Sequence, residues 1–329
     1  MSKFKAGLPI AILSSAVIVF SSQASSDLGF KMTPKVTYGF GNVTTDEIVH
    51  SRELWMNVFE PTDKSHIKET AIVMTFGGAF HQGSPDLSFN VGGAQDTSMN
   101  DYCQRFAKQG YVCFAIDYRL APENPLPTGI GYTAEDLDLE SISSMSQQIN
   151  LVRHQLGYDQ LDFNNPSEKS IIDKAILSAA EDLRNAVGYI KENSNEYGFN
   201  SSKVVLGGFS AGAVTSLNVA HGMKLPVAGT FMLSGGPAGF DIIKNTTNFE
   251  ASSPVLLFQG QNDLHAAFSI NPPLLEHYKQ EQIENTFAWV PGFGHFYPAE
   301  AVSLSGDGMR MSVEQRIMNF VSNIDQRSN

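Results

Sequence analysis

Basic residues, cysteines and repeated segments are all scarce in this 329-residue chain. No internal repeat or low-complexity tract is visible, so nothing indicates a repeat array or a long disordered linker. With 42% hydrophobic residues, the chain can bury a large core. A single globular domain is therefore expected over most of its length.

Basic residues are fewer than acidic ones: the chain has 22 lysines and arginines and 34 aspartates and glutamates. The formal charge of -12 argues against nucleic acid or an anionic membrane surface as a partner. Histidines at metal-ligand spacing are also lacking beside the acidic run from Glu135 to Glu140. We therefore expect neither a metal nor a cofactor.

A long, uninterrupted apolar run is absent even at the N-terminus. Met1 to Ala24 has two early lysines, an apolar stretch and a small-residue cleavage pattern at Ser22 to Ala24, which is typical of a secretory signal peptide. The alternative is a membrane anchor, but Pro9 interrupts the stretch and the stretch is short for a span. We expect an exported protein, periplasmic or secreted, whose mature domain covers residues 25–329 without a stable membrane span.

The stretch KVVLGGFSAGAVTSLNVAH, from Lys203 to His221, carries the strongest chemical signal. A buried strand ends at two glycines, and a segment of small residues that suits a helix begins at Ala211. Ser210 stands between them in the pattern Gly208-x-Ser210-x-Gly212, which is typical of a nucleophile elbow. The helix N-terminus at Ala211 faces the place where negative charge develops during acyl transfer.

Alternating strand and helix patterns along the rest of the chain predict an α/β fold, with a mostly parallel sheet covered by helices on both faces. A buried strand over Thr70 to Phe76 runs into a glycine-rich loop, where the N–H groups of Gly78 and Ala79 can form an oxyanion hole. Asp263 and His295 each follow a later strand. Because the carboxyl ends of parallel strands share one edge, all these groups are expected to meet there.

With these residues in view, the chain resembles the α/β-hydrolase carboxylesterases, especially the hormone-sensitive-lipase-like and feruloyl-esterase-like branches. The resemblance rests on three segments: DYRLAPE from Asp117, GGFSAG from Gly207 and PGFGH from Pro291. It implies that Ser210 is the nucleophile, Asp263 the triad acid and His295 the general base.

Two departures from this family are visible. Its oxyanion loop usually reads His-Gly-Gly-Gly, whereas this chain has Phe76-Gly77-Gly78-Ala79, which leaves open how the loop is held. The second departure is an insert from Thr128 to about Ser170, whose apolar residues recur at helical spacing. Since the insert leaves and rejoins the domain near the catalytic edge, we expect it to form a cap over the pocket.

The two cysteines, Cys103 and Cys113, lie in a predicted helix and in the strand that follows it. Their distances from the turn between these elements place them level with each other, so a disulfide is expected in an exported protein. Two separately buried thiols are the alternative.

The predicted function is hydrolysis of small or short-acyl carboxylic esters through an acyl-enzyme. A non-catalytic binding module on the same scaffold is the first alternative, because a fold does not fix a function. A serine peptidase fits less well. The natural ester and the oligomeric state stay open at this point.

Overall fold

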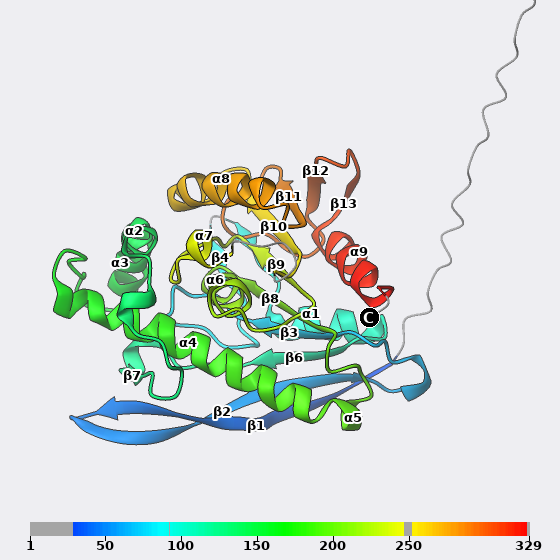
Figure 1. Ribbon diagram of the computed structural model, residues 1–329, viewed down its shortest axis with the longest axis horizontal. Coiled ribbons are helices and arrows are strands. Elements are labelled where there is room, and N and C mark those ends of the chain that lie inside the picture. The colour runs from blue at the N-terminus through cyan, green and yellow to red at the C-terminus, as the bar shows by residue number, and fades with distance from the viewer. Residues whose placement is uncertain (1–28, 92, 247–251, 328–329) are drawn as a thin grey trace, which may run out of the picture.

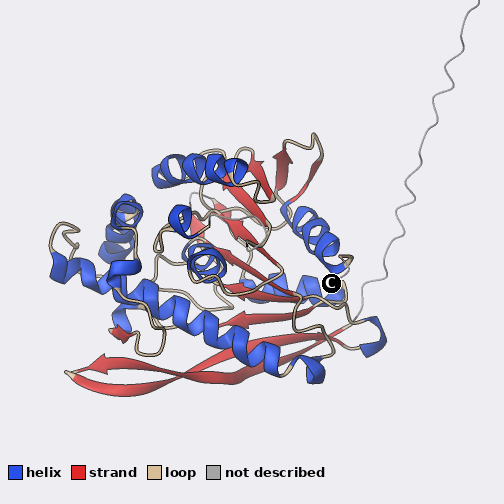
Figure 2. Ribbon diagram, in the orientation of Figure 1, coloured by secondary structure: helices blue, strands red, loops and turns tan. Residues whose placement is uncertain are grey.

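The computed structural model describes residues 29–91, 93–246 and 252–327. The predicted signal peptide, Met1 to Ala24, lies outside these residues. Helices pack on a single large sheet that runs through the molecule (Figures 1 and 2). None of the described helices is long and apolar enough to cross a bilayer.

The large sheet has the strand order β13-β12-β11-β10-β9-β8-β3-β6-β2-β1-β7. Its central strands, from β6 to β11 in this order, are parallel, and the strands at both edges are antiparallel. The predicted parallel sheet is therefore confirmed. Its strands are β1 (Phe30–Thr45), β2 (Ile48–Pro61), β3 (Ala71–Thr75), β6 (Val112–Ile116), β7 (Pro125–Leu126), β8 (Val204–Phe209), β9 (Gly229–Leu233), β10 (Val255–Gly260), β11 (Asn285–Val290), β12 (Val302–Ser305) and β13 (Arg310–Ser312), with β4 (Asn90–Val91) and β5 (Ala94–Gln95) pairing separately.

The helices connect these strands and cover the sheet. They are α1 (Met99–Lys108), α2 (Leu139–Ser144), α3 (Ser146–Gln155), α4 (Pro166–Glu192), α5 (Ser194–Tyr197), α6 (Ala211–Leu217), α7 (Ile242–Asn245), α8 (His265–Gln280) and α9 (Val313–Asp325). Short single turns are η1 (Lys64–His66), η2 (Ala121–Glu123), η3 (Ala134–Asp136) and the π turn η4 (Asn218–Gly222) that continues α6.

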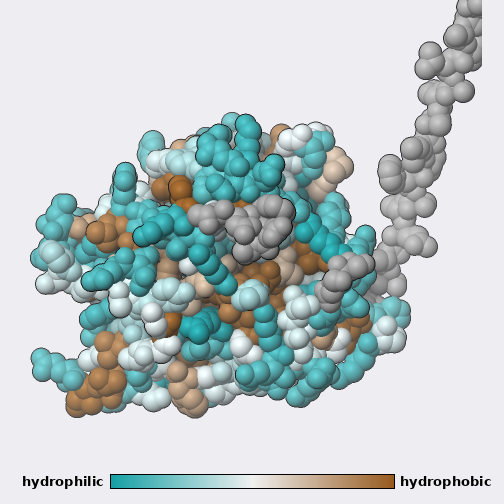
Figure 3. Space-filling model, in the orientation of Figure 1, coloured by the Kyte–Doolittle hydropathy of each residue, from teal (hydrophilic) through white to brown (hydrophobic). Residues whose placement is uncertain are grey.

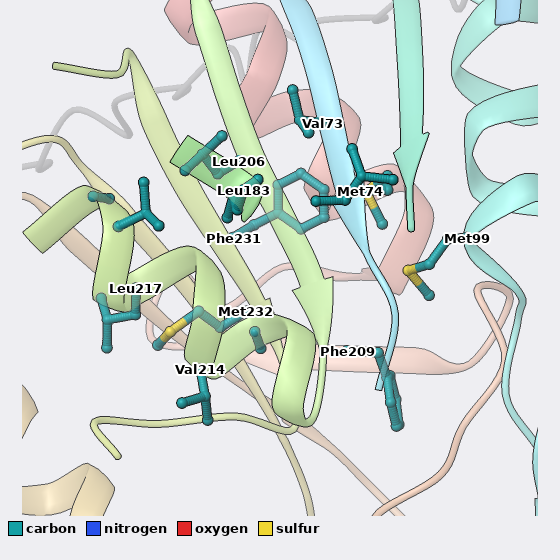
Figure 4. Close-up of a cluster of buried hydrophobic side chains, with 14 of the residues drawn as sticks. Val73, Met74, Met99, Leu183, Leu206, Phe209, Val214, Leu217, Phe231 and Met232 are labelled. Carbon is teal, nitrogen blue, oxygen red and sulfur yellow. The ribbon is translucent and has the colours of Figure 1, made fainter. Parts of the chain in front are cut away.

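Two helix pairs form the outer layers. In the view of Figure 1, α4 and α6 lie in front of the sheet and pack against each other. Helices α1 and α9 form the second pair, in which Arg105 of α1 donates to Glu314 of α9 over 2.8 Å. In Figure 4, Leu217 and Val214 of α6 point into the same buried cluster as Met232 of β9. This apolar cluster joins α6 to the sheet.

Several elements extend beyond the predicted ranges. The sequence predicts a helix over Leu274 to Gln280, whereas α8 begins at His265 and therefore includes two prolines, Pro272 and Pro273. The prediction missed this start because proline usually marks a helix boundary. Helix α4 begins at Pro166, so the last residues of the predicted insert are its first turn. The sequence also indicated neither α2 nor α3 as separate helices.

The apolar patterns of the sequence predict two short strands, Val36 to Phe40 and Leu54 to Phe59, and the strands of the β1–β2 ribbon are longer than both. Its residues pair from Phe30 with Pro61 to Thr45 with Ile48. Phe40, Ile48 and Val49 are mostly exposed near its free end. Figure 3 shows apolar atoms gathered at that end of the molecule.

The predicted disulfide is confirmed. Cys103 of α1 and Cys113 of β6 are bonded, and their Cα atoms lie 5.1 Å apart. Both side chains are fully buried. The bond therefore ties helix α1 to the sheet strand that follows it.

Candidate active site

Ser210 lies in the sharp turn between β8 and α6. Its backbone has φ 52° and ψ -117°, a conformation that is costly for a residue with a side chain. A Cβ on Gly208 would lie 2.4 Å from the Gly212 carbonyl carbon, and one on Gly212 would lie 2.0 Å from the Thr75 carbonyl oxygen. Only glycine fits at these two positions, which is the reason the sequence pattern demands it.

Three side chains from three strand ends meet at this turn. His295 Nε2 lies 2.9 Å from Ser210 Oγ, and His295 Nδ1 lies 2.7 Å from Asp263 Oδ1. With the proton on Nδ1 donated to the carboxylate, Nε2 is free to accept the serine hydroxyl proton. The structure thus brings together the three residues that the sequence predicted.

The Asp263 carboxylate accepts further hydrogen bonds besides the one from His295. Oδ2 accepts from Ser234 Oγ over 2.8 Å and from the Gly260 N–H over 3.1 Å, and Oδ1 accepts from the Leu264 N–H over 2.8 Å. Burial alone would raise the pKa of Asp263, but the hydrogen bonds from His295, Ser234 and Leu264 lower it below its ordinary value. The acid therefore stays ionised beside the imidazole.

Ser234 is a site residue that sequence reasoning missed. It follows β9 with φ 50°, and it lies within 3.1 Å of the Tyr297 hydroxyl. The only signal in the sequence was its place after a buried strand, at the same edge as Ser210 and Asp263.

The predicted oxyanion loop bends back on itself. Gly78 has φ 118°, and both Ala79 and Phe80 adopt the left-handed region, with φ 54° and 61°. A Cβ on Gly78 would lie 1.9 Å from the Gln82 carbonyl oxygen, so no other residue fits there. The Gly78 carbonyl accepts from the N–H groups of His81 and Gln82 over 3.0 and 3.2 Å. Because a trans peptide directs its N–H opposite its carbonyl, this pinned carbonyl fixes the direction of the Ala79 N–H.

The DYRLAPE segment supports this loop from behind. The Tyr118 hydroxyl donates to the Phe76 carbonyl over 3.0 Å, and its ring stacks on the Phe76 ring with centroids 4.3 Å apart. The Ala121 N–H donates to the Phe80 carbonyl over 2.7 Å. Aromatic stacking and backbone hydrogen bonds therefore hold a loop in which phenylalanine replaces the histidine of the resembled family.

Arg119 of the same segment is fully buried and paired. Its guanidinium lies 2.7 Å from Asp182 and 2.5 Å from Glu181, both on α4. It also donates to the carbonyls of Asn42 and Leu126. Asp182, which lies in the helix before the elbow, thus has a structural role as the partner of Arg119.

Two cavities open at Ser210. The smaller one has a volume of about 60 Å³ and an almost entirely apolar lining. The larger one, of about 620 Å³, is bordered by the oxyanion loop and by the loop that carries His295. Ser210, His295 and Ala79 border both cavities; Ala211 borders the smaller one and Gly78 the larger one.

The insert contributes to both cavities. Met145 and Ile149 line the smaller one, Leu151 and Val152 line the larger one, and Gln148 lies between them. Of the apolar residues that recur at helical spacing in the insert, Ile142, Ile149 and Val152 are buried, whereas Leu156 is exposed.

Asp96 is a second residue that the sequence did not single out. It is 6% exposed, and it accepts a hydrogen bond from the Phe89 N–H over 2.6 Å. Burial raises the pKa of Asp96 to about 6, opposed by that bond and by the nearby His295. Its neighbour Thr97 accepts from the Ala299 N–H, which joins this segment to the chain that follows His295.

Two histidines away from the triad, the buried His221 and the half-buried His277, have structural partners. His221 Nδ1 lies 2.6 Å from the Tyr278 hydroxyl, and burial lowers the pKa of His221 to about 4. His277 Nε2 lies 2.6 Å from the Thr246 carbonyl. Among residues 29–91, 93–246 and 252–327, no group of acidic, histidine or cysteine side chains is arranged to hold a metal ion.

Residues 158–304 match the model of the phospholipase/carboxylesterase family. The chain is also 30% identical over 142 residues to acyl-protein thioesterase 1 of the yeast Debaryomyces hansenii; that match covers 42% of this chain and 59% of the relative. The chain thus spans less than two thirds of the length of this relative.

Among solved structures, the fold is similar to an esterase of Thermogutta terrifontis, with a TM-score of 0.49, 15% identity, and 91% and 92% of the two chains covered. Esterase B of Lactobacillus rhamnosis is similar with a TM-score of 0.49, 14% identity, and 92% and 87% of the two chains covered.

The family match includes the elbow serine and extends past the histidine loop. The parallel sheet and the order Ser210, Asp263, His295 along the chain agree with it. This protein has the α/β-hydrolase fold.

Proposed function

We propose that the protein is an exported serine hydrolase that cleaves small carboxylic esters through an acyl-enzyme. The observation that carries the proposal is the contact of His295 with both Ser210 Oγ, at 2.9 Å, and Asp263, at 2.7 Å. These are hydrogen-bond distances at which a general base can act on a nucleophile.

In the proposed mechanism, Ser210 Oγ attacks the ester carbonyl while His295 Nε2 takes the hydroxyl proton. The Asp263 carboxylate stabilises the imidazolium and keeps the proton of Nδ1 in place. His295 then gives its proton to the departing alcohol oxygen, and a water molecule repeats the sequence on the acyl-enzyme. The N–H groups of Gly78, Ala79 and Ala211 bind the oxyanion, and the loss of one such donor typically costs about 10²–10³ in kcat.

The two cavities support a short acyl group. A cavity of about 60 Å³ is small, with room for only a few water-sized groups. We assign this apolar cavity to the acyl group. The larger cavity borders the His295 loop, which protonates the leaving oxygen, so we assign it to the alcohol.

The insert is proposed as a cap, with the boundaries 128–170 of the sequence prediction. Side chains from α3 and from Met145 line both cavities, which supports this role. A cap of this kind limits both the reach of the acyl group and the access of water.

Thioester cleavage is a second candidate, favoured by the similarity to acyl-protein thioesterase 1. The same triad serves esters and thioesters. A long acyl chain does not fit the smaller cavity, so a fatty acyl substrate would have to bind along the larger one. A non-catalytic binding module would leave the contact between Ser210 and His295 without a use, and a serine peptidase would need room for a peptide on both sides of Ser210.

The branch within the fold and the export of the protein are also proposals. The DYRLAPE and PGFGH segments support the hormone-sensitive-lipase-like or feruloyl-esterase-like branch. The disulfide between Cys103 and Cys113 supports an oxidising compartment, as expected after cleavage of residues 1–24. The N-terminal sequence of the protein recovered from the periplasm or medium tests this point directly.

The function is tested with p-nitrophenyl esters of increasing acyl length, alongside the matching thioesters. We expect kcat/KM to be highest for the acetyl or propionyl ester and to fall steadily for longer chains. Wild-type rates in a Ser210→Ala protein would show that the triad is not the catalyst. A preference for long acyl thioesters would instead favour thioester cleavage as the function.

A further inference from the structure

The imidazole of His81 lies directly behind the oxyanion loop. The side chain is 3% exposed, and Nδ1 lies 2.8 Å from the Ala79 carbonyl oxygen. On the other side of the ring, Nε2 lies 3.0 Å from Nη1 of Arg153. A guanidinium only donates hydrogen bonds, so Nε2 accepts and the proton is on Nδ1, which donates to Ala79.

His81 therefore engages two consecutive peptide groups of the loop. Its backbone N–H donates to the Gly78 carbonyl, and its side chain donates to the Ala79 carbonyl. The first of these peptides carries the N–H of Ala79, and the second follows directly after Ala79, so Ala79 is held from both sides. Since Ala79 and Phe80 both have positive φ, which is unfavourable for residues with a side chain, both need support from their surroundings.

Arg153 belongs to α3 of the insert. Its Nε donates to the Asp159 carbonyl over 2.7 Å, and its guanidinium lies 5.5 Å from the centre of the Tyr158 ring. The same helix supplies Gln148 and Val152 to the cavities. Arg153 is thus held within the insert while it contacts the residue behind the oxyanion loop.

The charge state of the ring agrees with this geometry. Burial lowers the pKa of His81, the Ala79 carbonyl opposes that shift, and the positive charge of Arg153 lowers the pKa further. The neutral imidazole is therefore favoured near neutral pH.

Resting on the function proposed above, we propose that His81 is a positioning residue for the oxyanion donor Ala79, and that Arg153 holds its imidazole in the required tautomer. The contact couples the seating of the insert to the shape of the oxyanion loop. It also supplies side-chain support to a loop that lacks the usual leading histidine.

Two isosteric variants separate the two hydrogen bonds. In His81→Asn, the amide nitrogen takes the place of Nδ1 and still donates to Ala79, but the contact with Arg153 is lost. In His81→Gln, the amide oxygen takes the place of Nε2 and still accepts from Arg153, but Ala79 loses its donor. Arg153→Met keeps an apolar stem and removes the charge. The matched controls are His50→Gln and Arg310→Met, at exposed positions of β2 and β13.

Kinetics on p-nitrophenyl acetate, normalised to titrated active sites, form the first readout. We expect His81→Gln to lower kcat about tenfold or more with little change in KM, as for a weakened oxyanion donor. His81→Asn should recover most of that loss. Arg153→Met should lower kcat severalfold in the wild-type background and should add nothing in His81→Asn, which has no tautomer to fix. Wild-type kcat per active site in His81→Gln, or equal losses in both histidine variants, would overturn the proposal.

The second readout does not depend on hydrolysis. Nitrogen NMR of the His81 ring, assigned by its disappearance in His81→Asn, should show the proton on Nδ1 in the wild type. In Arg153→Met, we expect a shift toward the commoner form protonated on Nε2. A wild-type ring protonated on Nε2 contradicts the proposal even if no ester is cleaved. Failure of the catalytic function alone would appear instead as unchanged turnover in Ser210→Ala.

Discussion

Ser234 Oγ donates a 2.8 Å hydrogen bond to Oδ2 of Asp263, whose other oxygen engages His295. The hydroxyl comes from the end of β9, a strand that lies between those carrying the serine and the acid. Every strand from β8 to β11 therefore contributes a group to the triad or to its support. The carboxylate is held on both oxygens, which fixes the plane in which it meets the imidazole.

Ser234→Ala tests this support. Loss of a hydrogen bond to a charged group costs about 1.5 kcal/mol, so we expect kcat to fall about tenfold with KM nearly unchanged. Steady-state kinetics on a short-acyl ester measure both constants. The control is Tyr297→Phe, which removes the hydroxyl behind Ser234 and should have a smaller effect. An unchanged kcat in Ser234→Ala would mean that Asp263 is oriented without this bond.

Asp182→Ala should destabilise the fold strongly. The substitution leaves the fully buried guanidinium of Arg119 without its main partner, and breaking a buried pair in this way costs about 3–5 kcal/mol. Denaturant unfolding measures the loss. As a matched control, Glu284→Ala removes an exposed partner of Arg327 and should cost less than about 1 kcal/mol. Similar losses in the two variants would refute the structural role given to Asp182.

Replacement of both cysteines by serine tests the disulfide. The bond closes a loop with a sequence separation of 10, for which the chain-entropy model gives about 3 kcal/mol. We expect the free energy of unfolding to fall by about that amount, while kcat per active site stays within about twofold because the bond lies away from Ser210. Reduction of the wild type should reproduce the loss. Two free thiols in the untreated exported protein would contradict the bond itself.

Asp96→Asn should change how stability depends on pH. Because burial raises the pKa of Asp96 to about 6, the folded protein binds this proton more tightly than the unfolded chain does. The stability that the group contributes is full below about pH 4 and is lost as pH rises to about 6. Asparagine does not ionise, so the free energy of unfolding of the variant should not lose this contribution. Between about pH 4 and pH 7 it should rise relative to that of the wild type by up to about 3 kcal/mol. If the difference in free energy of unfolding between the variant and the wild type does not vary with pH, Asp96 ionises as easily in the folded protein as in the unfolded chain.

The sequence predicted the catalytic edge because each of its motifs follows from a local constraint. Gly208 and Gly212 are required by the crowding around Ser210, and this crowding is a property of any strand-to-helix turn as tight as this one. The strand before Asp263 is buried and begins with four apolar residues, and the strand before His295 ends in the apolar residues Phe287 to Val290, so the ends of both strands could be located and assigned to one edge.

The supporting residues could not be predicted in the same way. Ser234 and Arg153 contact partners that are far away in the chain: Ser234 bonds Asp263 over 29 positions, and Arg153 pairs with His81 over 72 positions. No local pattern distinguishes such residues from ordinary polar ones. The start of α8 was missed for a different reason, because packing against the sheet outweighs the low helix propensity of Pro272 and Pro273.

The central claim is that Ser210 is the nucleophile, and covalent labelling tests it most directly. The exported protein is treated with a small organophosphate or sulfonyl fluoride, and its loss of esterase activity is followed beside the mass of its peptides. We predict one adduct per active site, on the peptide that contains Ser210, formed in step with the loss of activity, and no labelling of Ser210→Ala. Full inactivation with the adduct on another residue, or ester hydrolysis that survives complete labelling of Ser210, would contradict the account.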